Sequence, residues 1–179
     1  GNHGLELQGP KLRYVHRGAQ AARPILRRIA CDLKGVLEPI PGAWVEEKGL
    51  SVSVHWRRVP QSASLRFQRT VTQALTRWLK QGAIRVTHGK RVIDVRPPVD
   101  WDKGRIIAWL LQRRYGSPRR PQPLILYLGD DRTDEDAFRV ANRLRGMSVF
   151  VGARPRATAA RWRLRNPQEV RDMLARILP

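Results

Sequence analysis

Five acidic side chains stand together directly after an apolar segment. Residues 124–128 carry only one polar side chain, that of Tyr127, and end at Gly129. The carboxylates that follow are Asp130, Asp131, Asp134, Glu135 and Asp136. They make up a third of the 15 Asp and Glu residues in a chain whose net charge is +20. Crowded like charges cost free energy unless a cation or a helix terminus offsets them, and hard oxygen ligands suit Mg²⁺. The pattern therefore predicts a magnesium site.

Helix capping is an alternative explanation for part of this cluster. Thr133 could cap a helix, with residues 134–136 in its first turn, where acidic side chains are favourable. Capping does not explain Asp130 and Asp131. The apolar segment before them is typical of a strand buried on both faces of a parallel sheet. Ligands of open α/β sheets bind outside the carboxyl ends of the strands, which is where these two aspartates would lie.

The composition restricts the class of protein. A chain of 179 residues can build one good core, with room for a small inserted lobe. The single cysteine, Cys31, excludes an internal disulfide, indicates a reducing compartment such as the cytoplasm, and is expected to be buried. No apolar run is long enough to span a membrane. Basic residues are spread along the chain without a nucleic-acid-binding motif, so we expect no nucleic-acid partner and assign the charge to attraction of an anionic substrate.

Hydrophobic periodicity predicts two regions of different character. Residues 4–7 and 12–15 alternate as short strands that need partners elsewhere in the chain. Residues 21–39 form an amphipathic helix, followed by two strands within 43–59, a helix at 64–80 and a hairpin with strands at 84–86 and 92–95. After residue 98 the pattern becomes α/β, with helices near 103–115, 133–145 and 167–178 and strands at 124–128 and 147–151. This second region is typical of half a parallel sheet.

Five motifs occur in a fixed order: residues 1–6 (GNHGLE), 45–57 (VEEKGLSVSVHWR), 89–97 (GKRVIDVRP), 101–104 (WDKG) and 129–138 (GDDRTDEDAF). In this order and spacing they resemble the trehalose-phosphatase family of the haloacid dehalogenase superfamily. The resemblance covers nearly the whole chain. It implies an α/β fold, with an incomplete Rossmann-like core and an inserted α/β cap. Residues 1–20 would be a core segment, 21–96 the cap domain and 97–179 the core domain.

The resemblance also implies an activity, the Mg²⁺-dependent hydrolysis of trehalose 6-phosphate to trehalose. Lys103 matches the lysine that contacts the phosphate, and Asp130 matches the aspartate that ligates Mg²⁺. Asp131 and Asp134 would support Asp130, either as further ligands or from behind it. A fixed ammonium and a divalent cation are what a phosphate monoester needs to offset charge on its oxygens.

The cap of such enzymes binds the sugar. Glu46, Lys48 and Arg57 match positions expected to bind the trehalose hydroxyls and the phosphate, with Lys90 and Asp94 contributing from the later hairpin. Further candidates for substrate binding are Asn2, His3, His55 and Arg96. Asp94 stands where the family pattern leads us to expect glutamate, which is one methylene longer.

One motif of the superfamily is absent from these residues. The Asp-x-Asp-Gly-Thr sequence, which supplies the nucleophile and the general acid, does not occur here. We expect it upstream of Gly1, and we expect the 179 residues alone to be inactive. Two alternatives stay open: another capped sugar phosphatase, or a non-catalytic domain that binds a sugar phosphate. Either could be fused to or associated with a trehalose-phosphate synthase.

Overall fold

The computed structural model describes residues 1–10, 12–116, 123–153 and 157–177. The chain separates into two compact units. The N-terminal unit contains Asn2 and residues 4–100, and the C-terminal unit contains Gly1, His3 and residues 101–179. The division near residue 100 lies close to the expected boundary at residues 96 and 97. The assignment of residues 1–20 to the core stays a prediction.

The N-terminal unit begins with short elements that pair with one another. After the 3₁₀ turn η1 (Asn2–Gly4), strands β1 (Glu6–Gly9) and β2 (Leu12–Val15) form an antiparallel hairpin. The expectation that these two strands pair elsewhere in the chain was therefore wrong, since they pair with each other. The expected helix at 21–39 is present as α1 (Arg17–Ala21) and α2 (Arg23–Leu37), which meet at Ala22. Cys31 of α2 lies on the side of the helix away from the sheet and is exposed. The expectation of a buried thiol was therefore wrong.

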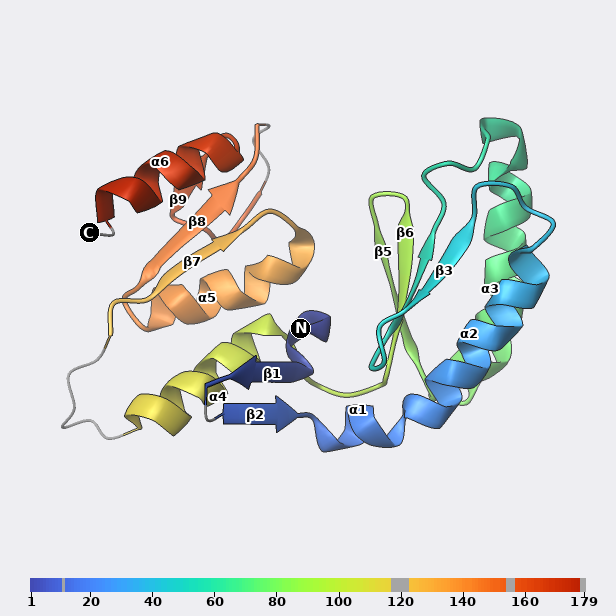
Figure 1. Cartoon of the computed structure of the whole chain (residues 1–179), viewed down its shortest axis with the longest axis horizontal. Coiled ribbons are helices and arrows are strands. Elements are labelled where there is room, and N and C mark those ends of the chain that lie inside the picture. The colour runs from blue at the N-terminus through green and yellow to red at the C-terminus, as the bar shows by residue number, and fades with distance from the viewer. Residues whose placement is uncertain (11, 117–122, 154–156, 178–179) are drawn as a thin grey trace. The chain divides into compact units, whose positions relative to one another are not determined.

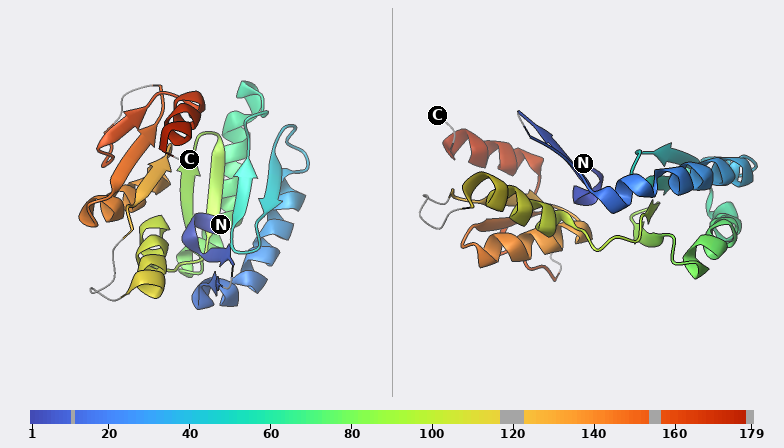
Figure 2. Two further views of the ribbon diagram at one scale, coloured as in Figure 1. Left: turned by 60° about the vertical axis from the view of Figure 1, so that its left-hand side comes forward. Right: turned by 90° about the horizontal axis from the view of Figure 1, so that it is seen from below.

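A four-stranded antiparallel sheet forms the centre of this unit. Its strands are β3 (Trp44–Glu47), β4 (Val52–His55), β5 (Arg85–Gly89) and β6 (Val92–Arg96), in the order β3-β4-β6-β5. Helix α2 and helix α3 (Ser64–Lys80), which follows the 3₁₀ turn η2 (Gln61–Ala63), cover one face (Figures 1 and 2). The core between helices and sheet is Leu26, Ile29, Leu33, Val52, Val54, Phe67, Val71, Leu75, Ile93 and Val95, with their neighbours.

The strand register places polar side chains on the open face of this sheet. Val52 and Val54 point to the helices, so their neighbours on β4, Ser53 and His55, point the other way. Ser53 pairs with Glu46 on one side and Asp94 on the other. Trp44, His55 and Val92 form the next row across the sheet. The open face therefore carries Glu46, His55 and Asp94, three of the residues that the sequence assigned to substrate binding.

The C-terminal unit is built on a parallel sheet in the order β7-β8-β9, with strands Leu126–Gly129, Met147–Val151 and Trp162–Leu164. Helix α5 (Glu135–Arg143) follows the 3₁₀ turn η3 (Arg132–Asp134), and Figure 1 shows α5 and α6 (Pro167–Ile177) on opposite sides of the sheet. Helix α4 (Lys103–Tyr115) packs on α5. The sequence did not predict β9, whose three residues are too few to show a period.

The strand that precedes the acidic cluster is less buried than its composition predicts. All four residues of β7 are half-buried, and Leu124 before it is 76% exposed. Within the described residues β7 pairs only with β8, so one edge of this strand has no neighbour. The expectation of a strand buried on both faces was therefore wrong for this chain. No helix in the described ranges is long and apolar enough to cross a membrane.

Candidate active site

One buried carboxylate organises the loop at the end of β7. Asp134 is only 4% exposed, and both of its oxygens accept hydrogen bonds. Oδ1 accepts from Lys103 Nζ at 2.8 Å and from the Tyr127 hydroxyl at 2.6 Å. Oδ2 accepts from the backbone N–H groups of Asp130 and Asp131, each at 3.1 Å. Asp134 thus ties a lysine of α4, a tyrosine of β7 and the strand-end loop together.

These contacts shift two pKa values in opposite directions. Burial is the largest single influence on Asp134 and raises its pKa, but hydrogen bonds from Lys103, Tyr127 and the Asp131 backbone together lower it further than burial raises it. Asp134 is therefore held as a carboxylate. Burial, followed by the hydrogen bond to Asp134, raises the pKa of the Tyr127 hydroxyl, so this group remains a donor.

Asp131 and Asp130 have different surroundings, although they are adjacent. Asp131 caps η3: its Oδ1 accepts from the backbone N–H and from the hydroxyl of Thr133, both at 2.6 Å. The sequence predicted Thr133 as the helix cap, but Asp131 is the cap and Thr133 donates hydrogen bonds to it. Asp131 Oδ1 also lies 3.8 Å from Lys103 Nζ. Asp130 is exposed, and its carboxylate makes no hydrogen bond or ion pair with any residue that the structure describes.

The donor set fits a divalent metal only in part. Asp130 offers hard carboxylate oxygens that are not already engaged, as Mg²⁺ prefers. Asp134 offers none freely, since each of its oxygens already accepts two hydrogen bonds. Among the described residues, no three His, Cys, Asp or Glu side chains gather closely enough to hold a metal ion. The assignments of Asp130, Asp131 and Asp134 as metal ligands stay predictions.

Lys103 is placed by the start of α4. Asp102 caps this helix, with Oδ1 accepting from the Arg105 backbone N–H at 2.8 Å, and Lys103 is its first residue. Gly104 follows, at the contact of α4 with α5. A Cβ atom on Gly104 would lie 2.6 Å from the Asp136 carbonyl oxygen and 2.9 Å from Val140 Cγ2. The absence of a side chain at Gly104 therefore lets α4 approach α5 and brings Lys103 to Asp134.

We expect Gly104→Ala to destabilise the chain, although alanine is the better helix former. The added methyl group must push α4 away from backbone atoms of α5, and such overpacking costs about 1–3 kcal/mol. The measurement is the free energy of unfolding in urea. Gly35→Ala in α2 is the matched control, because a Cβ there meets nothing within 4 Å and the change should stabilise by up to about 1 kcal/mol. Equal effects of the two changes would contradict this account of Gly104.

The open face of the four-stranded sheet groups several predicted sugar-binding residues. Glu46 Oε2 lies 2.9 Å from His55 Nε2 and 3.3 Å from Lys48 Nζ. The hydrogen bond with His55, and to a smaller extent the nearby Lys48, lower the pKa of Glu46 in spite of partial burial. One strand further on, the Ser53 hydroxyl donates to Asp94 Oδ1 at 2.5 Å. Carboxylates and an ammonium on one face can bind sugar hydroxyls with directional, charge-assisted hydrogen bonds.

The side chain of Asn2 makes three hydrogen bonds within the protein. Its amide Nδ2 donates to Glu6 Oε1 at 2.6 Å and to the Lys48 carbonyl at 2.9 Å, and its Oδ1 accepts from the buried Ser51 hydroxyl at 2.8 Å. These bonds hold the turn between β3 and β4, which carries Lys48. Asn2 therefore positions this turn in the structure, and its predicted contact with substrate stays untested. His3 belongs to the C-terminal unit.

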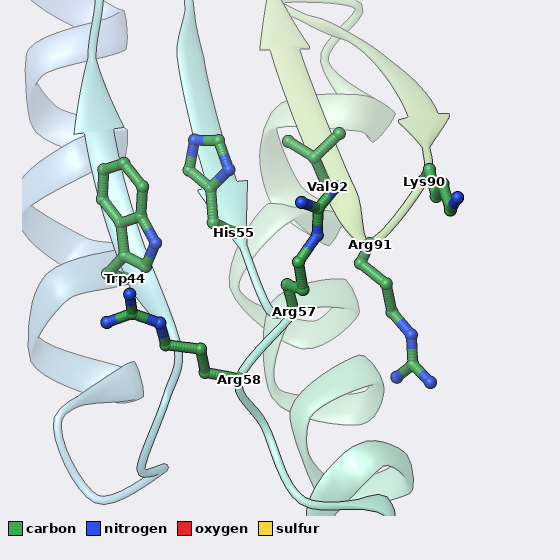
Figure 3. A pocket seen from close by; sticks show the side chains of 7 residues that line it. All are labelled: Trp44, His55, Arg57, Arg58, Lys90, Arg91 and Val92. Atoms are coloured by element: carbon green, nitrogen blue, oxygen red, sulfur yellow. The ribbon is translucent and has the colours of Figure 1, made fainter. Parts of the chain in front are cut away.

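The remaining predicted residues lie near the ends of the strands. Arg96 is half-buried at the end of β6, opposite Arg85. Arg57 and Lys90, with His55, line a pocket of about 490 Å³ (Figure 3). The other lining residues are Trp44, Arg58, Arg91 and Val92. Arg91 and Val92 stand in the motif at residues 89–97, but the sequence predicted no role for any of the four. The sequence also predicted no site role for Tyr127. Tyr127 is the one polar side chain in residues 124–128, and this could have indicated that its hydroxyl has a polar partner.

The parallel sheet, the loop held by Asp134 and the sheet-and-helix lobe define a class, the capped α/β proteins of haloacid dehalogenase type. Within that class the chain belongs to the trehalose-phosphatase family, whose model matches residues 1–168. It is 38% identical over 181 residues to the trehalose-phosphate phosphatase of Mycobacterium tuberculosis, covering 99% of this chain and 45% of that protein. It is 34% identical over 188 residues to the probable trehalose-phosphate phosphatase D of Arabidopsis thaliana, covering 99% and 50%.

A solved structure has the same fold. The C-terminal domain of the C. albicans trehalose-6-phosphate phosphatase superposes with a TM-score of 0.75 at 25% identity, covering 99% of this chain and 70% of that one. The sequence-based prediction of family and fold is thus confirmed. The chain spans about half the length of the curated relatives it matches.

Proposed function

We propose that this chain is part of a phosphatase that hydrolyses trehalose 6-phosphate to trehalose and phosphate. Besides the family, the observation that carries the proposal is the Asp134 carboxylate, which binds Lys103 through one oxygen and the Asp130–Asp131 backbone through the other. The Lys103 ammonium, at the start of α4, is thereby held next to the loop that carries the Asp130 carboxylate, with which no described side chain pairs. This is the arrangement that a phosphate monoester and its counterion would need.

Each group has a proposed role. Lys103 contacts an oxygen of the transferring phosphoryl group and offsets its charge. Asp130 would hold Mg²⁺, which when bound supplies further positive charge at the phosphoryl oxygens. Asp131 and Asp134 support Asp130 by fixing the loop. Glu46, Lys48 and Asp94, with Ser53, offer donors and acceptors for the sugar hydroxyls. The nucleophile is assigned to an aspartate outside these 179 residues.

The proposal predicts that the 179-residue chain alone releases no measurable phosphate from trehalose 6-phosphate, whereas the full gene product does so in the presence of Mg²⁺. Without a carboxylate nucleophile, the two-step route through an aspartyl-phosphate is closed. The measurement is phosphate release at saturating substrate. Turnover by the 179-residue chain that is lost in Asp130→Ala would contradict the assignment of the nucleophile.

A panel of sugar phosphates given to the full gene product tests the substrate. Trehalose 6-phosphate should be hydrolysed with the highest kcat/KM, and a clear preference for another phosphorylated sugar would replace the proposed substrate. A cytoplasmic location and an association with a trehalose-phosphate synthase stay predictions. Co-purification of a synthase with the full gene product would test the association.

A further inference from the structure

Two donors share one oxygen of the buried Asp134 carboxylate. The Tyr127 hydroxyl donates to Asp134 Oδ1 at 2.6 Å, and Lys103 Nζ donates to the same oxygen at 2.8 Å. The other oxygen, Oδ2, accepts from the backbone N–H groups of Asp130 and Asp131. A carboxylate has about four acceptor sites, so these bonds fill Asp134. No acceptor site of Asp134 is therefore left for a second N–H of Lys103.

Lys103 keeps donors that Asp134 does not take. A lysine ammonium carries more than one N–H donor, and among the described residues Lys103 donates a single hydrogen bond, the one to Asp134. Asp131 Oδ1 lies 3.8 Å from Lys103 Nζ, which is too far for a hydrogen bond. The Lys103 side chain is 28% exposed. Its remaining N–H groups can therefore bind an oxygen that arrives from outside the protein.

Packing fixes the positions of both Tyr127 and Asp134. The Tyr127 ring, on β7, packs edge-to-face on Phe138, with ring centroids 5.6 Å apart and 79° between the planes. Phe138 is fully buried. The Asp134 side chain lies against the backbone of Gly129, where an added Cβ atom would be 2.4 Å from Asp134 Cγ. The bond between the Tyr127 hydroxyl and Asp134 is thus set by contacts that do not involve Lys103.

We propose that Tyr127 is a positioning residue: its hydroxyl occupies an acceptor site of Asp134 and so leaves N–H groups of Lys103 for the phosphoryl oxygens. Two donors on one oxygen share its negative charge, and their partial positive charges repel each other. Without the hydroxyl, the freed acceptor site would take a second N–H of Lys103 and draw the ammonium toward β7. This inference rests on the proposed function, and it assigns Tyr127 no contact with the substrate.

The test is a double-mutant cycle in the full gene product, with Tyr127→Phe, Lys103→Met and the double variant. Tyr127→Phe keeps the ring on Phe138 and removes only the hydroxyl. We expect it to lower kcat for trehalose 6-phosphate about tenfold with KM within about twofold, because a displaced ammonium offsets less charge in the transition state. In the Lys103→Met background the same change should alter kcat less than about twofold, since the group through which Tyr127 acts is gone.

Tyr115→Phe is the matched control for the loss of a hydroxyl. Tyr115 is the last residue of α4, the helix that begins with Lys103, and its hydroxyl makes no hydrogen bond with any residue that the structure describes. This change should leave kcat within about twofold of the unmodified protein. Circular dichroism of each variant checks that it remains folded.

A second cycle with the same variants needs no catalysis and measures urea unfolding of the 179-residue chain with EDTA present. Because the two donors share Asp134 Oδ1, the loss of one strengthens the bond of the other, and the second loss then costs more than it would alone. Tyr127→Phe should therefore lower the urea midpoint more in the Lys103→Met background than in the unmodified chain.

Three results would overturn the proposal. An equal fall in kcat in both backgrounds would show that Tyr127 does not act through Lys103. A change in kcat of less than about twofold in the unmodified background would show that the hydroxyl positions no catalytic group. Shifts of the urea midpoint that simply add would show that the two donors do not compete. If the full gene product hydrolyses no sugar phosphate, the proposed function fails, and the unfolding cycle alone then decides whether Asp134 couples Tyr127 to Lys103.

Discussion

Asp134→Ala should destabilise the chain by about 3 kcal/mol, the largest loss of stability that we expect from a single substitution. The change removes a carboxylate that is 4% exposed and accepts four hydrogen bonds. The Tyr127 hydroxyl and the Lys103 ammonium would lose a buried partner, and the backbone N–H groups of Asp130 and Asp131 would lose their acceptor. The measurement is the free energy of unfolding in urea, with EDTA present.

Asp136→Ala is the matched control, two residues further along the same segment. The Asp136 side chain is 46% exposed and, among the described residues, pairs only with the exposed Arg139, so its loss should cost less than about 1 kcal/mol. The presence of EDTA matters because Asp134 was also predicted as a metal ligand. If Asp134→Ala were destabilising only when Mg²⁺ is present, its role would be metal binding rather than organisation of the loop.

Lys103→Met should reduce kcat/KM for trehalose 6-phosphate about a thousandfold in the full gene product. Removing a fixed positive group that offsets charge on a transferring phosphoryl group has effects of roughly this size. The prediction rests on the proposed function, and the measurement is initial-rate kinetics at several substrate concentrations. A fall in kcat would indicate an interaction made in the transition state, whereas a rise in KM alone would indicate binding only.

Arg113→Met is the control for this experiment. It removes an exposed cation from the last turn of the same helix, α4, and should leave kcat/KM within twofold of the unmodified protein. Since Lys103 also pairs with Asp134, circular dichroism of the Lys103→Met protein should show that it remains folded. Activity within tenfold of the unmodified protein would remove Lys103 from the catalytic site.

Much of the fold could be predicted because its elements repeat with a clear period. Helix α3 was expected at its observed bounds, residues 64–80, since its apolar side chains return at helical spacing. Strands β3 and β4 were expected on either side of Lys48 and Gly49, since apolar and polar side chains alternate along the second of them. The pairing of β1 with β2 and the strand β9 were not expected, because short segments carry little periodicity and pairing depends on distant neighbours.

The site was predicted less completely, and the reason is geometrical. Sequence spacing indicated which carboxylates cluster, but it could not show that Asp134 turns inward while Asp130 faces solvent. Tyr127 and Lys103 lie 7 and 31 positions from Asp134 along the chain, and only the packing of α4 and β7 brings them together. Trp44 and Arg58 belong to none of the five motifs, and no role was predicted for Arg91 within the motif at residues 89–97, so no signal in the sequence indicated that these three side chains line one pocket.

The three hydrogen bonds of Asn2 have a consequence for the order of folding. Two of them reach Lys48 and Ser51, 46 and 49 positions away, whereas the core of the four-stranded sheet is built entirely from residues 26–95. Closing a loop of this length costs conformational entropy that a few hydrogen bonds offset only after both ends are ordered. The sheet and its helices should therefore form first and Asn2 should dock last, so that the turn carrying Lys48 can open locally while the rest of the unit stays folded.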